Sequence, residues 1–194
     1  MRLLIFVLTL CCSAWAIAST AVSGTIQRNG DVFLLRLENL GSVYQIDSSS
    51  PEVIESLTKL STGDTLSGTG TIPYKSNKII LETIDYVGLR RMLGKWISND
   101  GLLQVKNFSE MKFYPHTVPG ASTNQTRIGL SEVPTTYQYS VTPAEGKAWV
   151  MFLSDSNKTV FATIQIHGAN ATLKTFDPET GAMTRTLRLT KWSN

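Results

Sequence analysis

Short β-prone runs separated by turn-forming residues fill this chain of 194 residues from residue 22 to residue 190. The firmest local pattern joins the runs 22–28 and 31–38 through Asn29-Gly30, a dipeptide that readily takes the positive φ of a two-residue hairpin turn. Polar and apolar residues also alternate through most of the later runs. The sequence therefore predicts a mainly β protein assembled from antiparallel hairpins.

The N-terminal half predicts five strands and one helix. The helix is expected from Pro51 to about Leu60, because Ser50 offers an N-cap side chain and Pro51 suits the first helical position. The expected strands cover residues 22–28, 31–38, 42–47, 64–73 and 78–88. Helical spacing predicts that Val53, Ile54, Leu57 and Leu60 pack on a sheet and that Glu52, Glu55 and Lys59 face water.

Three strands, a helix and two further strands within residues 22–91 resemble an OB-fold, a small partly open barrel of five strands. Gly68 and Gly70 support this resemblance, because a tightly coiled barrel strand needs inward positions without side chains where backbones approach. OB-folds bind oligonucleotides, oligosaccharides or proteins, and the resemblance implies these classes of partner. A net charge of −1 over residues 19–93, seven basic against eight acidic residues, argues against nucleic acid.

A second module is expected from Gly94 onward. Its β runs are separated by turn signals such as residues 99–101, which indicates an antiparallel meander. Tyr137, Tyr139 and Val141 alternate with polar residues and should share the face toward the core. The seven expected runs cover residues 102–108, 110–114, 136–141, 148–153, 159–167, 172–176 and 183–190.

A Gly-x-Trp at the start of such a meander, with an arginine on the last strand, is similar to the lipocalin and calycin pattern. The matching residues here are Gly94 and Trp96, and parity along the last run favours Arg185 over Arg188 as the arginine. The resemblance implies that Trp96 closes one barrel end and that Arg185 packs over its indole ring. It predicts a lipocalin-like barrel or sandwich over residues 94–194, with Gly94, Trp96 and Arg185 in structural roles.

Residues 1–18 have the features of a secretory signal peptide. Arg2 precedes a short apolar run, and Ala16-Ile17-Ala18 places small residues where signal peptidase cleaves, so the mature chain should start near Ser19. Both cysteines, at positions 11 and 12, fall in this segment. We therefore expect an exported bacterial protein, periplasmic or secreted, whose mature chain has no disulfide and no transmembrane span.

The expected organisation is thus a signal peptide at 1–18, an OB-like barrel at 19–93 and a lipocalin-like module at 94–194, each barrel with its own interior. No catalytic signature accompanies them. The mature chain has two histidines, His116 and His167, no thiol, and no metal-binding or nucleotide-binding motif. We therefore expect a protein that is not an enzyme and uses no metal or other cofactor. A hydrolase is the alternative, and it would need convergent polar groups around one of the histidines.

Residues 115–134 show no clear strand or helix pattern, and a loop this long in a compact domain is usually either functional or disordered. We expect a lid over the mouth of the second barrel or, alternatively, a flexible surface excursion. The residues predicted to bind a ligand in or near this segment are Tyr114, His116, Arg127, Tyr137 and Tyr139, the last two on an apolar wall.

Together these features predict a binding protein for a small amphipathic molecule or a cell-envelope glycan. The alternative is a protein-binding module, such as an inhibitor of an envelope-directed enzyme or an assembly factor. A large cavity in the second module would favour the small ligand, whereas a filled interior with an exposed apolar patch would favour a protein partner.

Overall fold

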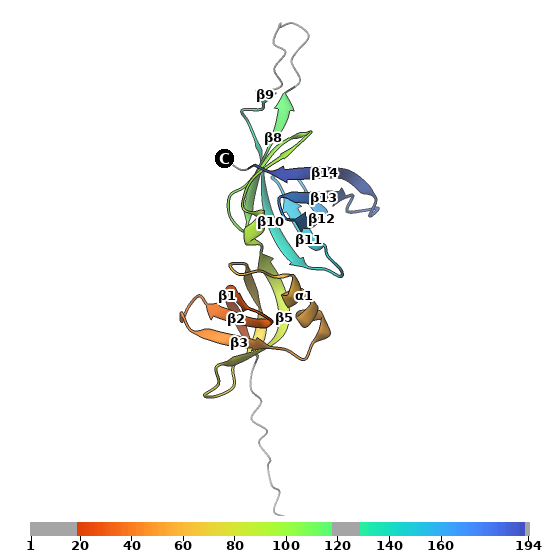
Figure 1. Ribbon diagram of the computed structural model, residues 1–194. Helices are drawn as coiled ribbons and strands as arrows, with labels where there is room; N and C mark the ends of the chain where they lie inside the picture. Colours follow the sequence, from red (N-terminus) through yellow and green to blue (C-terminus); the bar gives the residue numbers. More distant parts are fainter. Residues whose placement is uncertain (1–18, 118–128, 193–194) are drawn as a thin grey trace, which may run out of the picture.

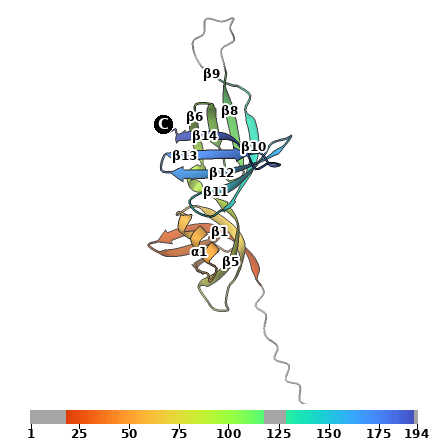
Figure 2. The ribbon, with the colours of Figure 1, turned by 90° about the vertical axis from the view of Figure 1, so that its right-hand side faces the viewer.

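Two β-barrels stacked along the long axis of the molecule make up the structure, a computed structural model that describes residues 19–117 and 129–192 (Figures 1 and 2). The predicted mainly β class is confirmed. The predicted signal segment, residues 1–18, lies outside the described residues, so its role stays a prediction.

The first barrel has the strand order expected of an OB-like fold. Its strands run in the order β1-β2-β3-β5-β4 and close where β1 pairs with β4. The β3–β5 pairing is parallel and the other four are antiparallel. The elements are β1 (Thr20–Asn29), β2 (Val32–Leu37), β3 (Val43–Asp47), α1 (Pro51–Lys59), β4 (Thr65–Thr71) and β5 (Lys78–Gly88).

Glycine backbone sets the tight turns and close approaches of this barrel. The predicted β1–β2 hairpin is confirmed, but because Asn29 pairs with Val32 its two-residue loop is Gly30-Asp31, with Gly30 at φ +59°. The inward positions Gly68 and Gly70 are also as predicted. A Cβ on Gly68 would lie 2.0 Å from the Thr83 carbonyl oxygen, and one on Gly70 would lie 2.7 Å from that of Ile80.

Helix α1 begins where the sequence predicts, with the Ser50 side chain accepting a hydrogen bond of 3.4 Å from the Val53 amide. Val53, Leu57 and Leu60 are buried as expected. Two expectations for this helix are wrong: that Ile54 packs on the sheet and that Lys59 faces water. Ile54 is 48% exposed, and the Lys59 ammonium lies 5.8 Å from the Trp149 ring centroid in the second barrel. The second barrel lies beside α1, so the face expected in water is partly covered.

The second barrel has eight antiparallel strands and closes where β8 pairs with β10. The short strand β9 pairs with the last residues of β8 on the same edge as β10, opposite β7. Strands β6 and β9 are not expected from the sequence, because five residues that start at Gly94 and two residues that follow a long polar stretch are too short to show a periodic pattern. The strands are β6 (Gly94–Ser98), β7 (Gly101–Val105), β8 (Glu110–Thr117), β9 (Gly129–Leu130), β10 (Thr135–Pro143), β11 (Trp149–Ser154), β12 (Thr159–His167), β13 (Asn170–Phe176) and β14 (Met183–Lys191).

Trp96 is buried at the end of this barrel that meets the first one. Its Nε1 donates a hydrogen bond of 2.7 Å to the Met92 carbonyl oxygen. The cation over its ring is Lys191, at 5.3 Å, so the expected Arg185 contact is wrong. The reason is the position of Arg185 along the barrel axis, far from Trp96. Strand β14 meets β6 only through Thr190 and Lys191, and six residues of strand place Arg185 roughly 20 Å away. Gly94 has φ +114°, with Lys191 Cε 3.7 Å from where its Cβ would be.

Contacts from β5 and the connecting turn hold the two barrels together. The connecting turn is the 3₁₀ helix η1 (Arg90–Met92). Tyr86, on β5, donates a hydrogen bond to the carbonyl oxygen of Phe108, in the β7–β8 turn of the second barrel. The buried apolar side chains of both barrels form one contiguous cluster, whereas the sequence predicts two separate interiors. The boundary at residues 93 and 94 remains a prediction.

Asp64 ties the first barrel to the connecting turn. Its fully buried carboxylate accepts hydrogen bonds from the Ser61 amide (2.8 Å) and the Arg90 amide (2.7 Å). Burial raises the pKa of Asp64 despite these bonds. Because the charged form is less favourable in the folded chain, the stability contributed by protonated Asp64 is fully present below its ordinary pKa and is lost as the pH rises through its folded pKa.

We expect Asp64→Asn to lower the free energy of unfolding most at acid pH, by about 1–3 kcal/mol, because an amide NH₂ cannot accept the second backbone bond. The difference from the parent should narrow as the pH rises, measured by urea unfolding between about pH 3 and 7. Asp155→Asn is the control of opposite sign. The amides of Asn157 and Lys158 lower the pKa of Asp155. The difference in the free energy of unfolding between the parent and Asp155→Asn should therefore widen as the pH rises. A constant Asp64→Asn difference would contradict the assignment.

Candidate functional site

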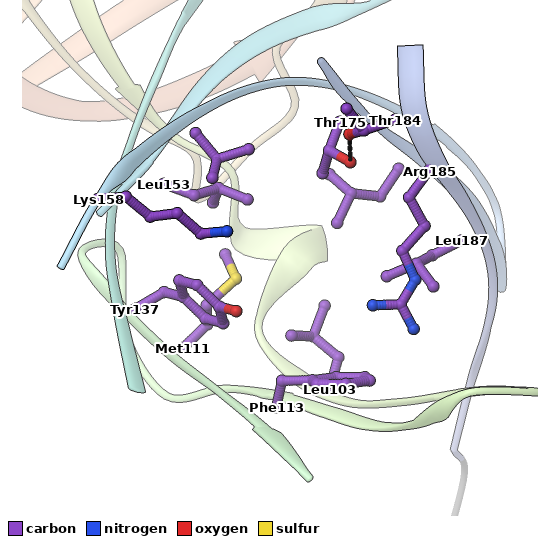
Figure 3. Close-up of a pocket in the computed structure, with 12 residues that line it drawn as sticks. Leu103, Met111, Phe113, Tyr137, Leu153, Lys158, Thr175, Thr184, Arg185 and Leu187 are labelled. Carbon is purple, nitrogen blue, oxygen red and sulfur yellow. Dashed lines mark hydrogen bonds between the residues drawn. The ribbon is translucent and has the colours of Figure 1, made fainter. Parts of the chain in front are cut away.

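The interior of the second barrel holds an open cavity of about 300 Å³ (Figure 3). Its deep part is apolar, and its rim is polar. Cross-strand pairing brings inward-facing residues together, as in the pairs Leu103 with Phe113 and Leu173 with Leu187. The buried lining residues are Leu103, Met111, Leu153, Leu173 and Leu187, and the remaining apolar ones are Phe113 and Val160.

The rim carries two cations and three hydroxyl groups. Arg185 donates to Asp100 Oδ2 from Nη2 (2.9 Å) and Nε (3.2 Å), and its guanidinium lies 5.6 Å from the Phe113 ring centroid. Lys158 extends from the start of β12, and its ammonium points into the cavity in Figure 3. The salt bridges of residues 19–117 and 129–192 include none to Lys158. Arg185 is thus neutralised by a protein carboxylate, whereas Lys158 is available to a ligand.

The hydroxyl groups of the rim can donate and accept. Thr175 and Thr184 share a hydrogen bond of 2.8 Å between their Oγ1 atoms. Burial raises the pKa of Tyr137, with Asp155 adding to the effect and Arg185 opposing it. The Tyr137 hydroxyl therefore stays protonated at neutral pH and can donate a hydrogen bond into the cavity. This rim suits a polar or anionic group on an otherwise apolar molecule.

One of the five predicted ligand residues, Tyr137, lines this cavity. Tyr139 lies deeper on the same face and donates its hydroxyl hydrogen bond of 2.7 Å to Asn107. Tyr114 and His116 alternate with the cavity residue Phe113, so they lie on the other face of β8. The Tyr114 hydroxyl lies 3.5 Å from Gln104 Oε1 there. Arg127 is outside the described residues.

Lys158, Thr175 and Thr184 are not among the predicted site residues, and Arg185 is predicted with a different partner, Trp96. All four lie at or near the ends of strands. A single polar residue there does not break the alternation of polar and apolar residues, so it does not stand out in the sequence. A usable signal existed for Lys158 and Arg185. Each precedes an inward-facing apolar residue by two positions, Val160 and Leu187, and therefore lies on the same face of its strand. A charged residue on the core-facing side at the end of a strand indicates a position on the barrel rim.

The segment 115–134 is partly strand, which corrects the expectation of a continuous loop. Strand β8 continues to Thr117 and pairs with β9, where His116 lies opposite Leu130. The His116 amide also donates to the Asp100 carbonyl oxygen at 3.0 Å, so β7–β8 hydrogen bonding extends past Pro115. Residues 118–128, which carry most of the predicted lid, lie outside the described residues.

The two histidines lie apart, His116 beside β9 and His167 at the end of β12 near the first barrel. In the described ranges 19–117 and 129–192, no group of three or more His, Cys, Asp or Glu residues is placed to hold a metal ion. No helix in that same part of the chain has the length and apolar character needed to cross a membrane.

The fold and the cavity define a class of protein, a pair of β-barrels in which an OB-like barrel precedes an eight-stranded antiparallel barrel with an open interior. No family model matches the chain, and no curated protein or solved structure matches it either. The site is therefore interpreted from its own geometry.

Proposed function

We propose that this is an exported, non-catalytic binding protein that holds a small amphipathic molecule in the cavity of its second barrel. The observation that carries the proposal is the division of that cavity into a buried apolar interior and a rim with Lys158, Tyr137 and two threonines. Export rests on the sequence of residues 1–18.

The dimensions and chemistry of the cavity favour an amphipathic ligand over a glycan. At roughly 30 Å³ for a group the size of water, 300 Å³ accommodates on the order of ten non-hydrogen atoms. Each buried CH₂ group contributes about 0.8 kcal/mol of transfer free energy. Sugar hydroxyl groups would need polar partners throughout, whereas the deep residues are leucines and a methionine.

A medium-chain carboxylate and the alcohol of the same chain length test this site. We expect the carboxylate to bind, measured by calorimetry. Val160→Trp should weaken both ligands about tenfold or more, because the indole occupies their space. Lys158→Met should weaken the carboxylate several-fold and leave the alcohol unchanged, since only the carboxylate has a charge to lose. Lys174→Met is the matched control, because it removes the same positive charge from an exposed position on β13 that does not line the cavity.

Absence of binding by both ligands, or equal binding in Val160→Trp and the parent protein, would refute the proposal. Circular dichroism of each variant separates loss of the site from loss of the fold, because a folded Val160→Trp barrel keeps the spectrum of the parent.

An aromatic groove on the outside of the same barrel favours protein binding as a second candidate function. Phe161 makes edge-to-face contacts with Phe152 and Phe176, at centroid distances of 5.4 and 6.1 Å. These rings line a groove of about 330 Å³ beside the β13–β14 turn, and Phe152 is 42% exposed. Phe152→Ser would disrupt a protein contact there and leave the cavity ligands unaffected, the reverse of Val160→Trp.

A further inference from the structure

A second hollow, of about 270 Å³, lies at the junction of the two barrels. It is distinct from the cavity inside the second barrel and shares no lining residue with it. Residues from β1, the end of α1, the turn η1, the β10–β11 turn and the end of β12 line it. Binding sites often occur at such junctions between domains, because the two bodies form a concave surface that neither has alone.

The charge of this junction groove is of one sign. Four of its lining residues are positively charged and none is acidic: Arg28, Lys59, Arg91 and Lys147, with His167 beside them. They come from sequence positions up to 139 residues apart, the difference between 28 and 167. Gathering like charges around one hollow is unfavourable unless something negative enters it.

The protein's own carboxylates leave much of this charge uncompensated. Lys59 pairs with Glu55 at 3.0 Å, and Arg28 is 4.0 Å from the fully exposed Asp31. Asp64 is the buried carboxylate near Arg91, but its two oxygens already accept the Ser61 and Arg90 amides. Lys147 is exposed, and the salt bridges within residues 19–117 and 129–192 include none to it.

Arg91 supplies an independent indication that a ligand belongs here. Its Nη2 donates a hydrogen bond of 3.0 Å to the Lys59 carbonyl oxygen at the end of α1. Its Nε is buried and has no hydrogen-bond partner among the described residues. A buried donor without a partner costs free energy, and a rotation of the Arg91 side chain that turns Nε toward the groove would let a bound acceptor remove that cost.

We propose that the junction groove binds a phosphate-type oxyanion. The planar fork of a guanidinium pairs with two oxygens of a tetrahedral anion, which matches a free Nε–H on Arg91. Lys147 and Arg28 add charge from opposite barrels. A volume of 270 Å³ exceeds a single phosphate, so the anion can carry an organic substituent. Because both barrels contribute, bound anion would hold them in one arrangement.

The test uses calorimetric titration of the full mature chain with inorganic phosphate at constant ionic strength. A second arm uses sedimentation with phosphatidylcholine vesicles, with and without phosphatidic acid, and so distinguishes free phosphate from a lipid headgroup. We expect binding in at least one arm. Arg91→Gln should weaken it about tenfold, in line with the loss of one charge-assisted hydrogen bond, and Lys147→Gln several-fold. Lys174→Gln, an exposed lysine outside the groove, should bind like the parent.

Arg91 also contacts the end of α1, so Lys147→Gln is the deciding variant if Arg91→Gln does not fold. Binding that depends on Lys147 in either arm supports the proposal, and the arm identifies the source of the phosphate. No binding in either arm overturns it, as does equal binding by Lys147→Gln and Lys174→Gln. Val160→Trp should leave phosphate binding unchanged, so the result is independent of the cavity ligand.

Discussion

Gly68→Ala should lower the free energy of unfolding by about 3 kcal/mol or more, a large share of the stability of a typical domain. The new Cβ would lie 2.0 Å from the Thr83 carbonyl oxygen and 2.8 Å from its carbon. Both are backbone atoms of β5, so the steric overlap can be removed only if β4 and β5 separate. The register of the β4–β5 pairing also shifts between Ser67 and Gly68.

Ser67→Ala is the matched control, since it also places alanine on β4, one residue away, at a position that already carries a Cβ. It should change the free energy of unfolding by no more than about 0.5 kcal/mol. Urea unfolding followed by circular dichroism measures both. Equal midpoints for the two variants would mean that β4 and β5 do not approach closely enough at Gly68 to exclude a side chain.

Local rules explain what the sequence predicts correctly. Gly68 and Gly70 are identifiable because a strand pattern with glycine on its inward positions has one common explanation, the approach of another backbone. Ser50 and Pro51 mark the helix start for similar reasons. Each depends on residues within a few positions, which the sequence displays directly.

Contacts between distant residues explain the errors. Lys59 has the spacing of a water-facing residue, and only the position of the second barrel places it over Trp149. The expected cation on Trp96 has the correct inward parity, but the depth at which β14 meets β6 selects Lys191. Depth along a barrel is set by strand register, which parity does not report.

The charged residues of the junction groove are likewise brought together only by folding, so their grouping could not be predicted from the sequence. Counted along the chain, residues 19–93 carry a net −1, and no dense basic stretch is visible. Folding nevertheless brings Arg28, Lys59 and Arg91 of this half beside Lys147 and His167 of the other. A basic groove assembled from five separate segments leaves no linear signature, because each segment contributes a single basic residue.

Trp96→Ala should lower the free energy of unfolding by about 4 kcal/mol, within the 3–5 kcal/mol typical of deleting a large buried aromatic side chain. Trp96 is 2% exposed where the barrels meet, so no neighbouring water can fill the space without opening the core. Its indole also bonds the Met92 carbonyl oxygen and supports the Lys191 side chain, which itself donates to the Arg91 carbonyl oxygen at 3.0 Å.

Two comparison variants separate these contributions. Trp96→Phe keeps most of the apolar area and leaves the Met92 carbonyl oxygen without its donor, so it should cost about 1–3 kcal/mol. Trp192→Ala removes a tryptophan that is 46% exposed and should cost less than about 1 kcal/mol. If Trp96→Ala proved no more destabilising than Trp192→Ala, the indole would not close the end of the second barrel.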